Sequence, residues 1–151
     1  MKLAIGSDHG GFELKEEIVK FVKTIKDIEL TDFGAACKES VDYPDYAQKV
    51  SEAISKGVAD RGILICGTGI GMSITANRYH GVRAALCHDH FTARMSRLHN
   101  DANILVLGDR VLGKGVALDM VQTWLETGFE GGRHQKRLDK IREIENTIKG
   151  K

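Results

Sequence analysis

The segment Cys66–Gly71, with the sequence CGTGIG, is the part of the chain best suited to chemistry on an anion. Its three alternating glycines leave backbone N–H groups unshielded, and a helix that follows would add the positive end of its dipole. Such a loop can bind an anion or stabilise an oxyanion that forms during a reaction. The same field favours the thiolate of Cys66. A tight turn beside a small buried cysteine is the alternative, and the glycine pattern favours the functional interpretation.

Three familiar phosphate-binding loops are excluded by the residues present. The loop Gly6–Gly11 has Asp8 where a dinucleotide fingerprint needs glycine, and this carboxylate would repel a pyrophosphate. No Gly-Lys-Ser/Thr triplet of a Walker loop occurs at the required spacing. Met72 stands where a cysteine phosphatase loop would have its arginine.

Histidines occur in three places where they could serve a site. His9 follows Asp8, a carboxylate that could fix the tautomer of the ring or cap a helix. The segment His99–Asp101 precedes a predicted strand, and a solvated loop is an equal alternative there. The His-x-His spacing of His88–His90 invites a metal site, but no paired cysteines accompany it and Asp89 has the character of a helix N-cap. We therefore predict no metal ligands.

Basic residues are placed where they could hold a phosphate. Arg110 follows the fifth predicted strand, and the last predicted helix begins with Arg133, His134, Lys136 and Arg137. Cations at a helix start oppose its dipole, so this placement weighs against a merely solvated surface. Arg133 and Arg137 lie four residues apart on one face, which suits a grip on phosphate from two sides.

Hydrophobic periodicity alternates between short apolar runs and helical spacing, which predicts strands and helices in turn. The five predicted strands are Lys2–Ser7, Glu29–Phe33, Gly62–Cys66, Val82–Cys87 and Asn103–Leu107. The predicted helices are about Leu14–Ile25, Pro44–Ile54, Ser73–Asn77, Phe91–Leu98, Leu112–Leu125 and Gln135–Lys149. This alternation indicates one Rossmann-like α/β domain over residues 1–151, with three α/β/α layers and a five-stranded parallel sheet. Ligands of such sheets bind at the carboxyl ends of the strands.

Composition limits the classes of partner. Hydrophobic residues make up 42% and charged residues 28% of 151, as in ordinary globular domains. The 22 basic and 21 acidic side chains leave a net charge of +1, so we expect neither nucleic acid nor a membrane as partner. The cysteines Cys37, Cys66 and Cys87 are odd in number and indicate no disulfide framework. Without a signal peptide or a long apolar run, the chain is expected in the cytoplasm.

Five motifs, in order along nearly the whole chain, resemble those of the type B ribose-5-phosphate isomerases. They are GSDHGGF at Gly6–Phe12, DYPD at Asp42–Asp45, CGTGIGMS at Cys66–Ser73, HNDAN at His99–Asn103 and GGRH at Gly131–His134. The wider family also contains galactose-6-phosphate and allose-6-phosphate isomerases.

The resemblance implies an aldose–ketose isomerase that interconverts ribose 5-phosphate and ribulose 5-phosphate through an enediolate. By the same resemblance, Cys66 moves a proton between C2 and C1, Thr68 and the loop amides stabilise the enediolate, and His99 opens the sugar ring. Further positions match substrate or phosphate contacts: Asp8, His9, Tyr43, Gly67, Gly69, Ile70, Gly71, Asn100, Arg110, Arg133 and Arg137. No metal or other cofactor is implied.

The family builds each site across a dimer interface, so at least a homodimer is implied and a tetramer stays open. We expect the last helix, about residues 135–149, to pack on the partner subunit. Two other functions remain open from the sequence. One is the same chemistry on a six-carbon aldose 6-phosphate, and the other is a non-catalytic module that binds a sugar phosphate or nucleotide.

Overall fold

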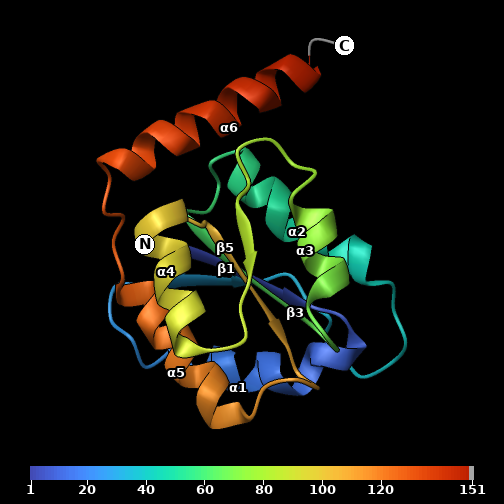
Figure 1. The fold of residues 1–151 in the computed structure, drawn as a ribbon. Coiled ribbons are helices and arrows are strands. Elements are labelled where there is room, and N and C mark those ends of the chain that lie inside the picture. The colour runs from blue at the N-terminus through green and yellow to red at the C-terminus, as the bar shows by residue number, and fades with distance from the viewer. Residues whose placement is uncertain (150–151) are drawn as a thin grey trace.

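Five parallel strands form one sheet in the computed structural model, which describes residues 1–149. In chain order the strands are β1 (Lys2–Ser7), β2 (Glu29–Asp32), β3 (Arg61–Cys66), β4 (Ala84–Leu86) and β5 (Ile104–Gly108). Every paired neighbour runs parallel, in the order β2-β1-β3-β5-β4 (Figure 1). The predicted five-stranded parallel sheet is confirmed.

Helices cover both faces of this sheet, as a nearly continuous apolar run such as β3 requires. The covering helices are α1 (Phe12–Val22), α2 (Tyr43–Ser55), α3 (Ile70–Ala76), α4 (His90–Asn100) and α5 (Lys114–Glu126), and α6 (Arg133–Lys149) follows them in the chain. A short 3₁₀ turn, η1 (His9–Gly11), precedes α1. Helices α1, α4 and α5 pack on one face, and α2 and α3 pack on the other.

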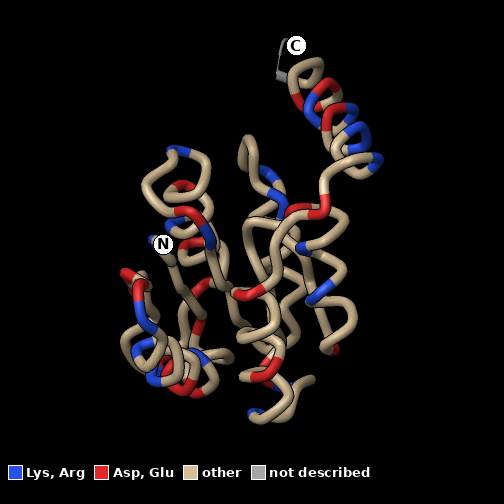
Figure 2. Tube along the Cα trace, turned by 90° about the vertical axis from the view of Figure 1, so that its left-hand side faces the viewer, with Lys and Arg blue, Asp and Glu red and all other residues tan. Residues whose placement is uncertain are grey.

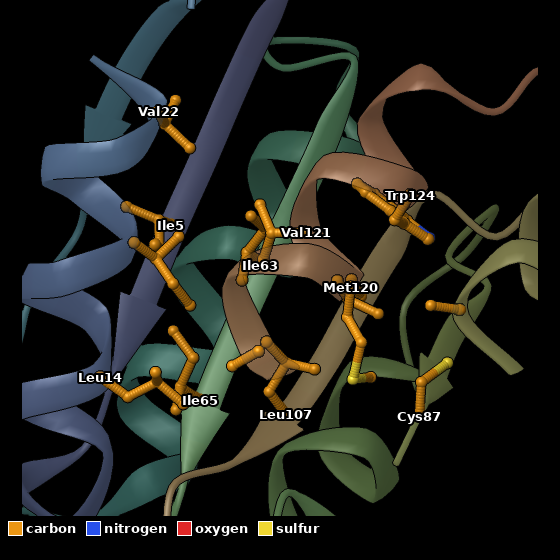
Figure 3. Close-up of a cluster of buried hydrophobic side chains, with 14 of the residues drawn as sticks. Ile5, Leu14, Val22, Ile63, Ile65, Cys87, Leu107, Met120, Val121 and Trp124 are labelled. Atoms are coloured by element: carbon orange, nitrogen blue, oxygen red, sulfur yellow. The ribbon is translucent and has the colours of Figure 1, made fainter. Parts of the chain in front are cut away.

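Two apolar cores hold the layers together because side chains alternate across the strands. Ile5, Ile63 and Leu107 point toward α1 and α5, where they meet Leu14 and the fully buried Trp124 (Figure 3). The other core joins alternate strand residues to α2 and α3, with members that include Ala4, Leu64, Val106, Val50 and Met72. Each face of the sheet is therefore anchored separately.

Strand order determines where loops can form a site. The chain passes from β1 to β2 on one side and then to β3 on the other side of β1. Ligands of open α/β sheets bind at such a change in strand order, outside the carboxyl ends of the strands. Asp8 follows β1 and Gly67 follows β3, so the two most distinctive loops of the sequence lie at this position.

Some element boundaries differ from those predicted. The helix expected from Ser73 begins at Ile70, because Gly69 adopts the left-handed conformation (φ 82°) and starts α3 at once. The strand expected over residues 82–87 is reduced to three residues, since β4 is an edge strand with one neighbour. The last helix begins at Arg133, two residues earlier than predicted.

Helix α6 lies outside the three layers and runs along the top of the molecule in Figure 1. Basic and acidic residues alternate along it where it stands away from the body (Figure 2). Its apolar side chains Ile141, Ile144 and Ile148 are 50%, 60% and 69% exposed, whereas Leu138 is buried. Within residues 1–149, no helix is long and apolar enough to cross a membrane.

Candidate active site

The loop between β3 and α3 surrounds the thiol of Cys66 with backbone donors. Cys66 is the last residue of β3 and is 6% exposed. Its Sγ accepts a hydrogen bond from the N–H of Gly69 at 3.1 Å, and the Thr68 Oγ1 accepts one from the N–H of Ile70 at 3.4 Å. The loop thus directs backbone N–H groups at the side chains of Cys66 and Thr68, and its binding of an anion stays a prediction.

Gly108 at the end of β5 supports this loop from behind, which gives a testable prediction. A Cβ at Gly108 would lie 2.7–2.9 Å from backbone atoms of Thr68, so alanine there must displace the loop. We expect Gly108→Ala to lower the free energy of unfolding by about 1–3 kcal/mol, as overpacking does, and to lower kcat. Gly113→Ala is the control, since no atom lies within 4 Å of its Cβ position. An unchanged kcat in Gly108→Ala would contradict the need for a fixed loop.

The loop after β1 lies beside the loop that follows β3. Asp8 is 8% exposed, and its Oδ1 accepts a hydrogen bond from the N–H of Gly11 at 3.0 Å. Asp8 thus caps η1, which fixes the direction of the following His9. The His9 Nδ1 lies 3.2 Å from both backbone polar atoms of Val41. A Cβ at Gly10 would be 3.3 Å from the backbone nitrogen of Gly67, so the β1 and β3 loops are in contact.

Arg110 and Tyr43 complete a set of side chains at the carboxyl edge of the sheet, which we call the carboxyl-edge group. The Arg110 N–H donates to the Gly67 carbonyl at 3.0 Å, and its Nε lies 3.4 Å from the Cβ position of Gly67. The ring of Tyr43, in the first turn of α2, packs against Gly71 so closely that a Cβ there would lie 2.6 Å away. The side chains that the fold gathers here are Asp8, His9, Tyr43, Cys66, Thr68 and Arg110.

The other predicted site residues lie at the opposite edge of the sheet. His99 and Asn100 end α4, which runs back from the carboxyl end of β4. The Asn100 carbonyl accepts a hydrogen bond from Arg83, which directly precedes β4. The length of β5, about 15 Å at 3.3 Å per residue, therefore separates His99 from Cys66 within one chain. The first turns of α6 bring Arg133 and Arg137 to the same edge. The amino-edge group consists of His99, Asn100, Arg133 and Arg137.

Two histidines stack at this amino edge. The rings of His99 and His134 are 4.2 Å apart between centroids and 7° from parallel. His134 is 2% exposed, and burial together with the positive charges of His99 and Arg133 lowers its pKa. The Arg133 Nε donates to the His134 Nε2 at 3.4 Å, so this nitrogen carries the lone pair. The lowered pKa and this hydrogen bond both favour the neutral form of His134 beneath His99.

Glu130 joins these histidines in the one cluster within residues 1–149 whose donor atoms are close enough for a metal. The donors of His99, Glu130 and His134 lie within 4.8 Å of one another. Lone pairs of imidazole lie in the ring plane, and nearly parallel planes keep them from converging on one point. A metal would need one ring to turn, so the cluster as folded is not a metal centre. In the His88–His90 segment, the Nδ1 of His90 lies 2.8 Å from the Oδ2 of Asp119. Asp89 caps α4 as predicted, because its Oδ1 accepts a hydrogen bond from the Thr92 N–H.

In the sequence, His134 belongs to a basic cluster at the start of the last helix, and its pairing with His99 was not predicted. The signal that could have found the pair is GGRH: Gly131 and Gly132 have φ of 70° and 55°, which L side chains rarely adopt. These two left-handed residues fold the chain back so that α6 starts beside the end of α4. The Glu130 N–H donates to the Leu98 carbonyl at 3.0 Å and anchors that reversal.

The protein is a parallel α/β domain with a thiol in a glycine-rich loop and with arginines suited to a phosphate. This combination is typical of enzymes that act on sugar phosphates. The family described as Ribose/Galactose Isomerase matches residues 3–141. The chain belongs to this family. The matched span includes the carboxyl-edge and the amino-edge groups.

Individual relatives agree with this family over nearly their whole length. Ribose-5-phosphate isomerase B of Escherichia coli is 47% identical over 144 residues, covering 95% of this chain and 96% of that protein. D-erythrulose-4-phosphate isomerase of Pectobacterium atrosepticum is 40% identical over 142 residues, or 93% of each chain. The solved structure of ribose-5-phosphate isomerase B from Clostridium thermocellum has a TM-score of 0.95 at 57% identity, covering 98% of this chain and 99% of that one.

Proposed function

We propose that this protein is an aldose–ketose isomerase that interconverts D-ribose 5-phosphate and D-ribulose 5-phosphate. The observation that carries the proposal is the Cys66 thiol, held by the Gly69 N–H at the mouth of a glycine-rich loop. The names of the E. coli and C. thermocellum relatives support the substrate. The Pectobacterium relative carries the name of a four-carbon substrate, so family membership alone leaves the sugar open.

In the proposed reaction, Cys66 is the base that moves one proton. Its thiolate removes the proton from C2 of the open-chain aldose, and the C2–H electrons form the C1=C2 bond of an enediolate. The same sulfur returns the proton to C1, and a proton passes from O2 to O1, which leaves a hydroxyl on C1 and the ketone at C2. Thr68 and the amides of Gly67, Gly69, Ile70 and Gly71 stabilise the enediolate oxygens, and one such donor contributes about 3–4 kcal/mol to lowering the barrier.

Ring opening must precede this proton transfer, because only the open-chain aldehyde has an acidic C2 proton. We assign ring opening to His99, whose side chain is 37% exposed and open on the face away from His134. Asp8, His9, Tyr43 and Asn100 are assigned to the substrate hydroxyls. Arg110, Arg133 and Arg137 are assigned to the phosphate, which guanidinium groups bind in bidentate fashion.

The phosphate assignment predicts the effect of removing Arg137. We expect Arg137→Ala to raise KM about 10- to 100-fold with little change in kcat, because a charge-assisted hydrogen bond of about 1.5–3 kcal/mol is lost. Steady-state kinetics on ribose 5-phosphate measure both constants. Lys140→Ala, one turn along α6, removes an equally exposed positive charge as the control. A KM equal to that of the native protein would make Arg137 a surface residue only.

We propose that a second copy of the chain completes each site. Cys66 and His99 belong to groups at opposite edges of one sheet, so one chain alone cannot bring both to one sugar. Contact between the carboxyl edge of one copy and the amino edge of another would unite them. A twofold axis would then form two equal sites in a homodimer. A tetramer built from such dimers and a cytoplasmic location remain predictions from the sequence.

The apolar side of α6 supports this assembly. Together with Val82, Ala84 and Ala102, it lines a groove of about 440 Å³. Ile141, Ile144 and Ile148 are too exposed for a finished core. We assign this groove to the partner subunit, which would bury the three isoleucines.

Initial rates on two sugars test the proposed function. We expect a higher kcat/KM for ribose 5-phosphate than for allose 6-phosphate. A clear preference for the hexose phosphate would replace the substrate and keep the chemistry. If the protein binds ribose 5-phosphate and never exchanges its C2 proton with solvent, the isomerase proposal fails and a binding module remains.

A further inference from the structure

The stack of His134 on His99 has no role in the proton transfers assigned above. His134 comes from the first turn of α6, and its nearly complete burial keeps it from reaching a substrate. Its ring face lies parallel to that of His99 at a centroid distance of 4.2 Å. One face of His99 is thereby covered by protein, while its side chain remains 37% exposed.

Several contacts hold the lower ring in place. The backbone N–H of His134 donates to the Gly131 carbonyl at 3.0 Å and fixes the backbone, and the Arg133 Nε donates to the ring Nε2 of His134. The Glu130 carboxylate lies 3.8 Å from the Nε2 of His99 and 3.9 Å from that of His134. His99 lies in the last turn of α4, and its side chain is 37% exposed. The buried ring of His134 is therefore the surface that limits rotation of the His99 ring.

The neutral state of the lower ring also matters for the charge of His99. In ring opening, an acid–base group takes a proton from the C1 hydroxyl and gives one to the ring oxygen, so it becomes positively charged in between. A second cation directly beneath it would oppose that charge, whereas the π face of a neutral ring stabilises it. Burial and the neighbouring guanidinium of Arg133 keep His134 uncharged.

We propose that His134 is a positioning residue for His99, whose stacked ring holds the His99 imidazole in the orientation that ring opening needs. The inference rests on the proposed function, because it assumes that His99 opens the sugar ring. It predicts a selective defect. Losing the stack should slow the steps before the enediolate and leave the Cys66 proton transfer unchanged.

The two reactions can be measured separately. Conversion of ribose 5-phosphate needs ring opening, whereas exchange of the C1 proton of ribulose 5-phosphate with D₂O starts from an open chain and needs only the enediolate. We expect His134→Ala to lower kcat for conversion about 10- to 100-fold, part of the 10²- to 10⁴-fold typical of an acid–base group, with C1 exchange within about twofold of native. His134→Phe, which restores a flat ring, is expected to recover most of the conversion rate.

The control is His90→Ala, which removes an exposed imidazole from the other end of α4. Equal loss of conversion and exchange in His134→Ala would show a general structural role and overturn the proposal. Full conversion in His134→Ala, or a His134→Phe variant that folds and is as slow as His134→Ala, would overturn it as well. If the native protein exchanges the C1 proton but does not convert ribose 5-phosphate, the failure lies in the proposed function and not in the stack.

Discussion

Replacing Cys66 with alanine is expected to lower kcat for ribose 5-phosphate about 10²- to 10⁴-fold, the usual contribution of a positioned base. The cause is local: the Gly69 N–H would lose its sulfur partner, and no other base stands in the loop Cys66–Gly71. Substrate binding should persist, because the arginines that are assigned to the phosphate are unchanged. The measurement is steady-state kinetics together with isothermal titration of ribose 5-phosphate.

Cys87→Ala is the matched control for this experiment. Cys87 is buried like Cys66 and directly follows β4, the strand on the far side of β5, but burial raises the pKa of its thiol. Cys87→Ala should therefore cost some stability and leave kcat close to native. If Cys66→Ala retains native kcat, the base is another residue and the mechanism assigned to the loop is wrong.

Mixing two inactive variants is expected to restore activity. In a hybrid dimer of Cys66→Ala and His99→Asn chains, one site would carry both substitutions and the other would carry neither. Random exchange of subunits makes half of the dimers hybrid, so about one quarter of native activity should return. The physical reason is the separation of His99 from Cys66 by the length of β5.

Each variant alone and a mixture that cannot complement are the controls. Cys66→Ala mixed with a Cys66→Ala/His99→Asn double variant forms hybrid dimers without any intact site, and it should stay inactive. Size-exclusion chromatography with light scattering shows whether dimers form and exchange. If the first mixture forms hybrid dimers and gains no activity, each site lies within one chain and the shared site is wrong.

The sequence predicts the parallel sheet and the reactive loop because their signals are local. Apolar runs such as β3 and glycines such as Gly69 reflect backbone requirements of nearby residues. Strand order is set by packing between distant segments, and no local pattern reports it. The edge strand β4 illustrates the limit, since six apolar-rich residues predicted a strand of which three pair.

For the same reason, only part of the candidate site could be predicted from the sequence. Asp8, Cys66 and Arg110 were expected at strand ends, and the fold brings their loops together. His99 and Arg137 were also singled out from sequence, but only the direction of α4 shows that they lie at the other edge. The stack of His134 on His99 depends on a chain reversal at two glycines, which a helical pattern does not reveal.

The most direct test of the central claim is the fate of hydrogen when the native protein acts on ribose 5-phosphate in D₂O. A thiol that takes a proton from C2 can exchange it with solvent before returning it to C1. With Cys66 as the base, ribulose 5-phosphate should carry deuterium at C1, detected by NMR, and Cys66→Ala should convert the sugar about 10²- to 10⁴-fold more slowly. Conversion that never introduces deuterium at C1, even after prolonged incubation, would indicate hydride transfer between the carbons and contradict the enediolate mechanism.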